Sequence, residues 1–347
     1  MKAPGARASR SRWSALRRTL IAASCVLWVL ASIALVDRAH VLDPEAWLET
    51  SDGVAPASCE GTTLRYLSFW DENRYEPNDF AGWANLGFTR NASSISRGSA
   101  LGISHLYKVH GVFFSRGDPE HPTRGALRLR PDYASRWAEE RATTVDALWD
   151  AEAIMGFYLG DELVWNGLSV DDVDAAARSI RAAFPSAIIW YNEARGALRG
   201  GMDRRRRRHG YDRVPAAVSW FSIDYYHVRP DGGNHVARLR QFYDSAVYPK
   251  LHAHQAAVLI PGAFGSRHNH RCDVACYDRF CAEDAWRFFE WAMADARIVA
   301  MAPYHWNTCS RCRSTRNEIG AKDLNATRAA WEAIGRRIED TWKACPK

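Results

Sequence analysis

Residues 156–165 read GFYLGDELVW, a short apolar and aromatic run that ends in two adjacent acids and a tryptophan. Side chains alternate between the two faces of a β-strand. Tyr158 and Glu162 therefore share one face, and the apolar Phe157 lies on the other. We expect a buried strand whose carboxyl end carries an Asp-Glu pair, Asp161 and Glu162.

Seven other runs rich in β-branched and aromatic residues surround this strand, and helical patterns separate them. Strands that alternate with helices are the signature of a parallel sheet with crossover helices. Eight such units across about 280 residues predict an α/β protein of the (β/α)8 class, a TIM barrel. An open, doubly wound sheet is the rival architecture. The expected strands lie within residues 64–70, 82–88, 104–114, 153–160, 187–192, 218–226, 256–262 and 297–304.

The expected helices are clearest in the second half of the chain. Ser169 precedes an amphipathic pattern and Asp172 follows three residues later, which predicts a capping box at the start of a helix over 169–184. Asp171 and Asp174 then belong to the first turns of that helix, where the macrodipole favours acids, so a metal-binding DxD motif is disfavoured. Further helical patterns cover residues 132–151, 281–295 and 323–342.

The first 36 residues differ from the rest of the chain in charge and hydropathy. They contain no acid, and their six basic residues equal the whole net charge of +6, so the remaining chain is neutral overall. A domain without a basic excess disfavours a nucleic-acid partner. Residues 20–36, LIAASCVLWVLASIALV, carry no charge and predict a short membrane anchor, with a cleaved signal peptide as the alternative. The basic residues are Lys2, Arg7, Arg10, Arg12, Arg17 and Arg18.

These patterns divide the chain into four parts. Residues 1–19 form a basic cytosolic tail, 20–36 the signal anchor, 37–60 a stem and 61–347 the barrel. The positive-inside rule places the barrel in the lumen, and the short span favours the thinner membranes of the ER and Golgi. We therefore expect a type II membrane protein; cleavage of the apolar segment would instead give a secreted one.

Sequons and cysteines agree with an oxidising lumen. Asn91-Ala-Ser and Asn325-Ala-Thr are acceptor sequences for N-glycans. The cysteines after the anchor are expected to form disulfides, and their odd number leaves one without a partner in the chain. A zinc site that combines them with His268 and His270 is disfavoured because the spacing does not give two pairs of ligands. No metal or other cofactor is predicted. These cysteines are Cys59, Cys272, Cys276, Cys281, Cys309, Cys312 and Cys345.

In a barrel of this class the active site lies at the carboxyl ends of the strands. A carboxyl group at Glu162, surrounded by Tyr158 and Trp165, can keep its proton near neutral pH through desolvation, as a general acid must. Strand six ends in SIDYY, and Asp224 shares the inward face with Ser222. The other candidates are polar or aromatic residues at strand ends: Asn85, Lys108 or His110, Asn192, Glu193, Tyr225, Tyr226 and Trp306.

The Gly-Asp-Glu motif that ends at Glu162 resembles the hexosaminidase and related families of the TIM-barrel glycoside hydrolase superfamily. The resemblance implies that Glu162 is the general acid and base and that Asp161 orients a 2-acetamido group of the substrate. The pair Asp224 and Tyr225 resembles a chitinase-like pattern, which implies that these residues hold the acetamido oxygen. In the same families a tryptophan at the place of Trp306 forms the floor of the sugar subsite.

The chain departs from the large retaining clan of this superfamily, which has a glutamate at the end of strand seven. Residues 261–264 read PGAF here, so a double displacement would need Glu193 or Asp224 as the nucleophile. A substrate-assisted route fits better, as does an inverting pair of carboxyls ~6.5–9.5 Å apart. We hypothesise a lumenal glycosidase that acts on an oligosaccharide, with N-acetylated sugars as the expected substrates. The alternatives are a barrel that binds glycans without cleaving them and a Golgi glycosyltransferase, which would need an open sheet.

Overall fold

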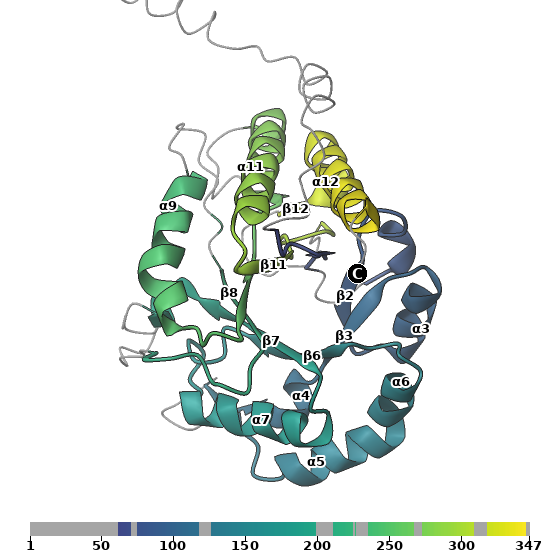
Figure 1. Cartoon of the computed structure of the whole chain (residues 1–347), viewed down its shortest axis with the longest axis vertical. Helices are drawn as coiled ribbons and strands as arrows, with labels where there is room; N and C mark the ends of the chain where they lie inside the picture. The colour runs from purple at the N-terminus through teal and green to yellow at the C-terminus, as the bar shows by residue number, and fades with distance from the viewer. Residues whose placement is uncertain are drawn as a thin grey trace, which may run out of the picture. The chain divides into compact units, whose positions relative to one another are not determined.

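The computed structural model describes residues 62–70, 75–117, 126–198, 211–224, 226, 235–266, 273–308 and 318–344. Its main feature is a curved sheet of eight parallel strands with helices around the outside (Figure 1). The order across the sheet is β1-β11-β9-β8-β7-β6-β3-β2, which is the order along the chain once β1 and β2 are joined. The strands are β1 (Tyr66–Leu67), β2 (Leu86–Thr89), β3 (Ser104–Lys108), β6 (Gly156–Asp161), β7 (Ile188–Ala194), β8 (Trp220–Asp224), β9 (Ala256–Leu259) and β11 (Ile298–Met301).

Asn85, immediately before β2, joins the two edge strands. Its backbone N–H donates to the carbonyl of Leu67 at 3.2 Å. Its side-chain Oδ1 accepts from the N–H of Leu67 at 2.9 Å, and its Nδ2 donates to the carbonyl of Arg65 at 2.9 Å. The side-chain amide thus supplies the hydrogen bonds that a further ladder residue would supply. The predicted (β/α)8 barrel is confirmed, and the rival open sheet is wrong because its two edges are bonded to each other.

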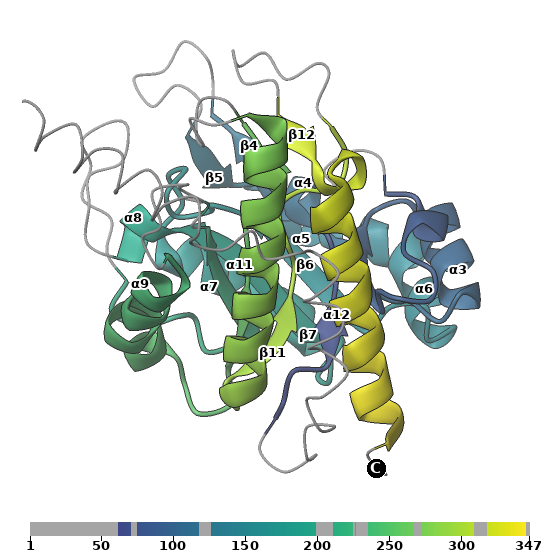
Figure 2. The same ribbon diagram turned by 90° about the horizontal axis from the view of Figure 1, so that it is seen from above.

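Helices cover the outside of the barrel, and α11 and α12 run side by side along it (Figure 2). The helices are α3 (Ala92–Ala100), α4 (His110–Phe113), α5 (Tyr133–Glu140), α6 (Asp146–Asp150), α7 (Val170–Ala183), α8 (Arg195–Leu198), α9 (His235–Phe242), α11 (Val274–Ala294) and α12 (Asn325–Ala344). Short helical turns are η1 (Pro77–Asp79), η2 (Arg141–Val145), η3 (Tyr243–Val247), η4 (Tyr248–Lys250) and η5 (Ala321–Asp323).

Local capping explains where these helices begin. The predicted capping box is present at α7: Ser169 Oγ accepts from the N–H of Asp172 at 3.0 Å, and the N–H of Ser169 donates to Asp172 Oδ2 at 3.2 Å. Helix α11 begins at Val274 rather than at residue 281. Its earlier start follows from Asp273, whose side chain accepts from the N–H of Cys276 at 2.9 Å and caps the first turn.

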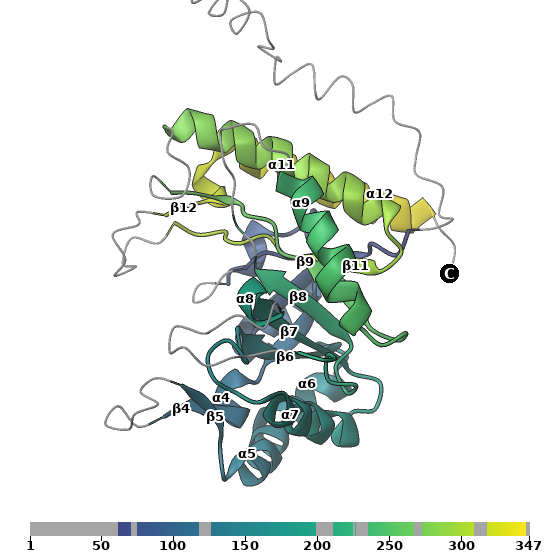
Figure 3. The same ribbon diagram turned by 90° about the vertical axis from the view of Figure 1, so that its left-hand side faces the viewer.

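Two small antiparallel sheets lie at the same end of the barrel, apart from each other (Figure 3). One pairs β4 (Phe114–Arg116) with β5 (Leu127–Leu129), and the other pairs β10 (Phe264–Gly265) with β12 (Ile319–Gly320). Both are built from connections that leave the carboxyl ends of barrel strands. They therefore surround the end of the barrel where the predicted site residues lie.

The core has two layers, as the alternation of side chains along β6 predicts. Tyr158 belongs to the cluster inside the barrel, whereas Phe157 belongs to the larger cluster between the sheet and the helices. The interior cluster combines large aromatic residues with smaller aliphatic ones. It comprises Trp70, Leu86, Phe88, Leu106, Tyr158, Trp190, Trp220, Val258, Ile260, Ala300 and Ala302.

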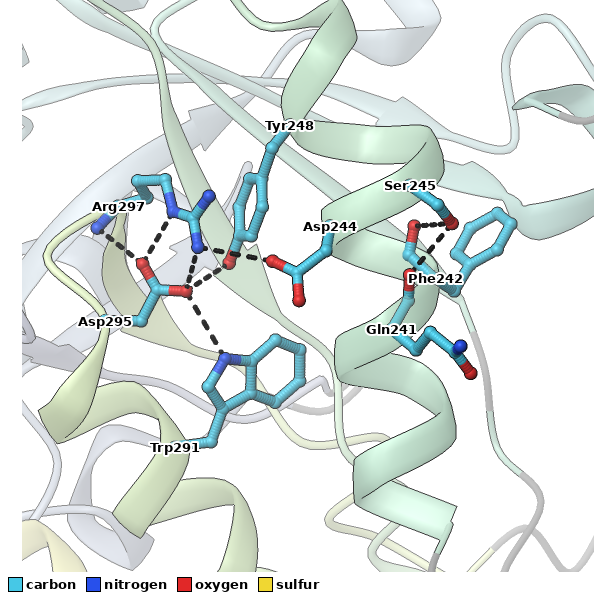
Figure 4. A network of polar contacts seen from close by, with 8 residues as sticks. All are labelled: Gln241, Phe242, Asp244, Ser245, Tyr248, Trp291, Asp295 and Arg297. Carbon is cyan, nitrogen blue, oxygen red and sulfur yellow. Dashed lines mark hydrogen bonds and ion pairs between the residues drawn. The ribbon is translucent and has the colours of Figure 1, made fainter.

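An ion-pair network fastens the amino end of β11 to the neighbouring helices (Figure 4). Asp295 accepts hydrogen bonds from Nε and Nη2 of Arg297 at 2.8 Å each and from the hydroxyl of Tyr248 at 2.9 Å. The guanidinium of Arg297 lies over the ring of Tyr248, 3.5 Å from its centroid. Although burial raises the pKa of Asp295, these bonds lower it further, to about 2. The network therefore stabilises the end of the barrel opposite to the predicted site.

The predicted anchor at residues 20–36, the tail and the stem lie outside the described residues. In the part of the chain that the structure describes, no helix has the length and hydropathy needed to cross a membrane. Of the cysteines expected to pair, Cys276 and Cys281 are described, and no disulfide joins them to each other. The other five also lie outside the described residues.

Candidate active site

Three carboxyl groups gather at the carboxyl ends of two barrel strands. Asp161 is the last residue of β6, Glu162 follows it, and Asp224 is the last residue of β8. Strand β7 lies between them, with Asn192 paired to Asp161 in register. All three carboxyl side chains are partly exposed, so they lie at the rim and not within the packed interior.

The side-chain amide of Asn192 connects two of these carboxylates. Its Nδ2 donates to Asp161 Oδ1 at 2.8 Å and also to Asp224 Oδ1. Because one nitrogen binds both oxygens, the two oxygens are at most about 6 Å apart. The orientation of the amide is fixed from below: its Oδ1 accepts from Ser222 at 2.7 Å, and the Ser222 hydroxyl accepts from Trp190 Nε1 at 2.9 Å.

The backbone presents Glu162 in an uncommon conformation. Its φ is 47°, in the left-handed region that residues with a Cβ rarely adopt. Gly160, with φ 149°, precedes the pair and leaves room for the ring of His110, which a Cβ at Gly160 would approach to 2.6 Å. The N–H of Glu162 donates to the carbonyl of Asn192 at 2.9 Å. Backbone strain of this kind is concentrated at functional sites, where the surroundings hold it.

Electrostatics in this cluster favour a retained proton. Burial raises the pKa of Asp224 above its usual value, and the negative charge of Glu162 raises it further. The hydrogen bonds from Asn192 and from the hydroxyl of Tyr226, which donates to Asp224 Oδ1 at 2.5 Å, oppose this rise without cancelling it. A proton held by one carboxyl of such a pair at higher pH than usual is available for transfer to a bound group.

Aromatic rings surround the carboxyls. Tyr226 stacks on Tyr304, with ring centroids 4.8 Å apart. Tyr158, which is 4% exposed, packs inside the barrel against Trp190 at a centroid distance of 4.8 Å. His110, the first residue of α4, is partly buried, and burial lowers its pKa. The interior below the carboxyls is thus filled by rings, and the carboxyls are the polar groups at its mouth.

The structure places Glu193 away from this group, which corrects its expected role as a second carboxylate. Its side chain is fully buried on the helix-facing side of β7, opposite to Asn192. Its oxygens accept from the backbone N–H groups of Val164 and Trp165 at 2.9 and 3.1 Å. Glu193 therefore supports the turn after β6 and does not reach the rim.

Trp306 and Asn85 are also placed differently from the expectation. Trp306 is 3% exposed, packs between Phe69 and Trp83 in the outer core, and donates from Nε1 to Asp79 at 3.0 Å. A ring buried in this way cannot form the floor of a sugar subsite. The amide of Asn85 is used in the closure of the barrel, so it is not available to a substrate.

Of the remaining predicted residues, Trp165 is partly buried and lies against Gly196 of α8, where a Cβ would come within 2.5 Å of its ring. Tyr225 lies outside the described residues. The support of Asn192 by Ser222 and Trp190 was not predicted. The alternation along β7 and β8 is the signal that could have found it, because it puts these two residues on the same inward face as Asn192 and Asp224.

Within the described residues no group of three His, Cys, Asp or Glu side chains is arranged to hold a metal ion. Asp161 and Asp224 accept hydrogen bonds from the amide of Asn192, and Asp224 also accepts one from the hydroxyl of Tyr226.

Comparison with known proteins finds solved structures of similar fold. No known family model and no curated protein matches the sequence. Xylanase XynB from Paenibacillus barcinonensis, solved with a conduramine derivative, is similar in structure with a TM-score of 0.50 at 13% identity; the match covers 79% of this chain and 96% of the xylanase. A glucosidase from Croceicoccus marinus matches with a TM-score of 0.50 at 12% identity, covering 80% of this chain and 69% of the glucosidase. At such identities the likeness shows the fold alone, a (β/α)8 barrel.

Proposed function

We propose that the chain is a glycoside hydrolase that cleaves an oligosaccharide by general acid catalysis. The observation that carries this proposal is the gathering of Asp161, Glu162 and Asp224 at the carboxyl ends of β6 and β8, among aromatic rings. Enzymes with this fold have their active sites at that end of the barrel. Glycosidases generally act with a pair of carboxyl groups, one of which keeps its proton. The fold shared with a xylanase and a glucosidase supports the same reaction class.

In this proposal Glu162 donates a proton to the glycosidic oxygen while the bond from that oxygen to C1 breaks. In this reactive form the single proton of the Glu162 and Asp224 pair is on Glu162 and Asp224 is ionised, so the carboxylates of Asp161 and Asp224 stabilise the positive charge that develops at C1. Asn192 keeps both carboxylates in place, so little reorganisation is needed as the charge appears. Tyr226 and the neighbouring Tyr225 are the aromatic residues proposed to contact the sugar.

N-acetylated sugars are the proposed substrates, because β9 is followed by PGAF at residues 261–264 and not by a carboxylate that could attack C1. The acetamido oxygen of the substrate would form the bond to C1 in its place. Asp161 would accept the hydrogen bond of the acetamido N–H and orient the group. Water would then add to C1 as the bond between C1 and the acetamido oxygen breaks, and it would give a proton to the carboxylate of Glu162, which restores the acid.

We further propose that the barrel lies in the lumen of the ER or Golgi, held by an anchor at residues 20–36. The support is the uncharged segment behind six basic residues, and the exposure of Asn91 and Asn325 in the two sequons. Protease treatment of intact microsomes tests this location. Protection of the barrel, lost on addition of detergent, is the expected result; digestion without detergent would contradict it.

The activity is tested with the full chain in detergent and a pool of N-glycans, glycolipids and chitooligosaccharides, with products read by mass spectrometry. The wild type is expected to release a sugar whose mass identifies the substrate class. Glu162→Gln is expected to lower the rate by about 10²–10⁴-fold, the usual contribution of a general acid. Full turnover by Glu162→Gln would refute the assignment of the acid.

Glu152→Gln is the matched control for this experiment. Glu152 also has a left-handed backbone, with φ 53°, but it precedes β6 and so lies at the opposite end of that strand from Glu162. It is exposed. The same exchange of oxygen for nitrogen is made in the same backbone conformation, so this variant is expected to keep the wild-type rate.

A second candidate function is a barrel that binds glycans without cleaving them. The observation that favours it is the absence of a carboxyl group after β9, since residues 260–266 are described and none of them is acidic. Retention of a glycan by both the wild type and Glu162→Gln, with no product from either, would establish this function and contradict the hydrolase.

A further inference from the structure

A buried carboxylate that the proposed reaction does not use lies directly behind the turn after β6. Glu193 is fully buried, and its two oxygens accept hydrogen bonds from four donors. At Oε2 these are the N–H of Val164 at 2.9 Å and the hydroxyl of Tyr211 at 2.7 Å. At Oε1 they are the N–H groups of Trp165 at 3.1 Å and of Ala194 at 2.8 Å. A side chain with this many donors around it is built into the structure at a defined position.

Two of the four donors belong to the turn that carries Glu162. The turn is hydrogen-bonded to two successive residues of β7. The N–H of Glu162 donates to the backbone carbonyl of Asn192, and the N–H groups of Val164 and Trp165 donate to the side chain of Glu193. The left-handed backbone of Glu162 persists only if its surroundings hold it. The bonds to Glu193 are the part of that support contributed by a side chain.

Trp165 of the same turn also packs against helix α8. The ring of Trp165 lies on Gly196, where a Cβ would come within 2.5 Å of the ring. Helix α8 follows β7 without a break, so the turn, the strand and the helix form one unit around Glu193. A change at Glu193 is therefore transmitted to the turn and from there to Glu162.

We propose that Glu193 is a positioning residue, whose carboxylate binds the N–H groups of Val164 and Trp165 and so holds Glu162 in the conformation from which it donates its proton. This inference rests on the proposed function, because it concerns the acid of that reaction. It adds a residue on the far side of the sheet to those that touch the substrate.

The ionised form of Glu193 is the one that fits. Its three N–H neighbours can only donate, and an ionised carboxylate is a pure acceptor. Burial raises the pKa of Glu193 to about 7, and the hydrogen bond from Tyr211 and those from the backbone oppose the rise. A glutamine at this position would turn an NH₂ group toward N–H donors, which breaks at least one of the bonds to the turn.

The test uses Glu193→Gln, the milder Tyr211→Phe, and Asp295→Asn as a matched control. Asp295 is likewise buried and accepts from a tyrosine hydroxyl and a backbone N–H, but it lies at the amino end of β11 (Figure 4). The first readout is hydrogen exchange of peptides that cover residues 160–168, followed by mass spectrometry. The second is the change in kcat and in KM on the substrate that the wild type cleaves.

Glu193→Gln is expected to speed exchange of at least one of the Val164 and Trp165 amides by roughly tenfold or more, since an NH₂ group replaces one acceptor oxygen and the other oxygen is no longer charged. We expect kcat to fall by about 10²-fold with KM within about threefold, because misplacement of the acid slows proton transfer and leaves binding intact. Tyr211→Phe keeps the bonds to the backbone and is expected to show smaller changes in the same direction. Asp295→Asn is expected to lower stability without changing either readout.

Unchanged exchange at residues 160–168 in Glu193→Gln would overturn the proposal, and so would a fall in kcat that Asp295→Asn reproduces. Hydrogen exchange does not depend on the reaction. If the wild type cleaves no glycan, the proposed function is wrong. Faster exchange in Glu193→Gln, and not in Asp295→Asn, would still show that Glu193 positions the turn after β6.

Discussion

Asn192→Asp is the substitution that tests the carboxyl cluster most directly, because it replaces the NH₂ group of the side chain by an oxygen and leaves the size of the side chain unchanged. In the wild type the Nδ2 group donates to Asp161 and to Asp224. An oxygen in its place faces two carboxylate oxygens with no hydrogen between them. The new carboxyl must therefore bind a proton in the folded protein, whereas in the unfolded chain it titrates normally.

The size of the effect follows from the spacing of the groups. Two unit charges ~4 Å apart at an effective dielectric constant of about 20 repel by about 4 kcal/mol. One such neighbour raises the pKa of the new carboxyl by about three, from about 4 to about 7. Because the folded variant binds the proton more tightly than the unfolded chain, its stability relative to wild type falls as pH rises through that range. The expected additional loss between pH 5 and pH 8 is about 3 kcal/mol.

Urea unfolding followed by tryptophan fluorescence at pH 5 and pH 8 measures this loss. Asn78→Asp is the control: Asn78 is exposed and its Nδ2 donates to Glu76 at 3.1 Å, so the same exchange is made beside a carboxylate in solvent. Solvent screens the repulsion between these exposed carboxylates, so the loss of stability between pH 5 and pH 8 in Asn78→Asp should be at most about 1 kcal/mol. If the loss of stability in Asn192→Asp is the same at both pH values, the carboxylates are not gathered around Asn192 and the account of the site is wrong.

Two further predictions concern stability away from the rim. Asp295→Asn is expected to lower the free energy of unfolding by about 2 kcal/mol at pH 7, because Arg297 and its neighbours hold the pKa of Asp295 at about 2. That stabilisation is present above pH ~4 and is lost as pH falls toward 2, so the difference in stability between variant and wild type should disappear in acid. A difference that stays constant with pH in urea unfolding would count against this explanation. Trp306→Ala removes a ring that is 3% exposed and is expected to cost about 3–5 kcal/mol in urea unfolding; a stable variant with weakened glycan binding would instead show that the ring contacts the sugar.

The barrel could be predicted from the sequence because each of its strands leaves a local signal. The apolar run that ends at Asp161 and the helical patterns between the other runs place eight strands in order, and each expected range overlaps one strand of the barrel. The alternation along β6 also predicted that Tyr158 faces inward. The capping box of Ser169 and Asp172 marked the start of α7 for the same reason: both signals are confined to a few neighbouring residues.

The site could be predicted only as far as the alternation of a strand extends. Trp306 lies five residues beyond the end of β11, where a period of two no longer determines which way a side chain points. Glu193 lies within β7, but its partners are the backbone N–H groups of the turn after β6, which no pattern in its own strand reveals. Asn85 closes the barrel through contacts with β1, some 20 residues away. Contacts of this kind depend on which strands become neighbours, and that is known only once the sheet is formed.

The role of Glu162 as general acid is tested most directly by the dependence of the rate on the leaving group. Wild type and Glu162→Gln are compared on the oligosaccharide that the wild type cleaves and on a p-nitrophenyl glycoside of the same sugar, whose leaving group needs no proton. We predict that kcat/KM falls by about 10²–10⁴-fold on the oligosaccharide and by less than about tenfold on the p-nitrophenyl glycoside, since kcat/KM reports the steps up to departure of the leaving group and not the later attack of water. An equal loss on both substrates, or no loss on the oligosaccharide, would contradict the account.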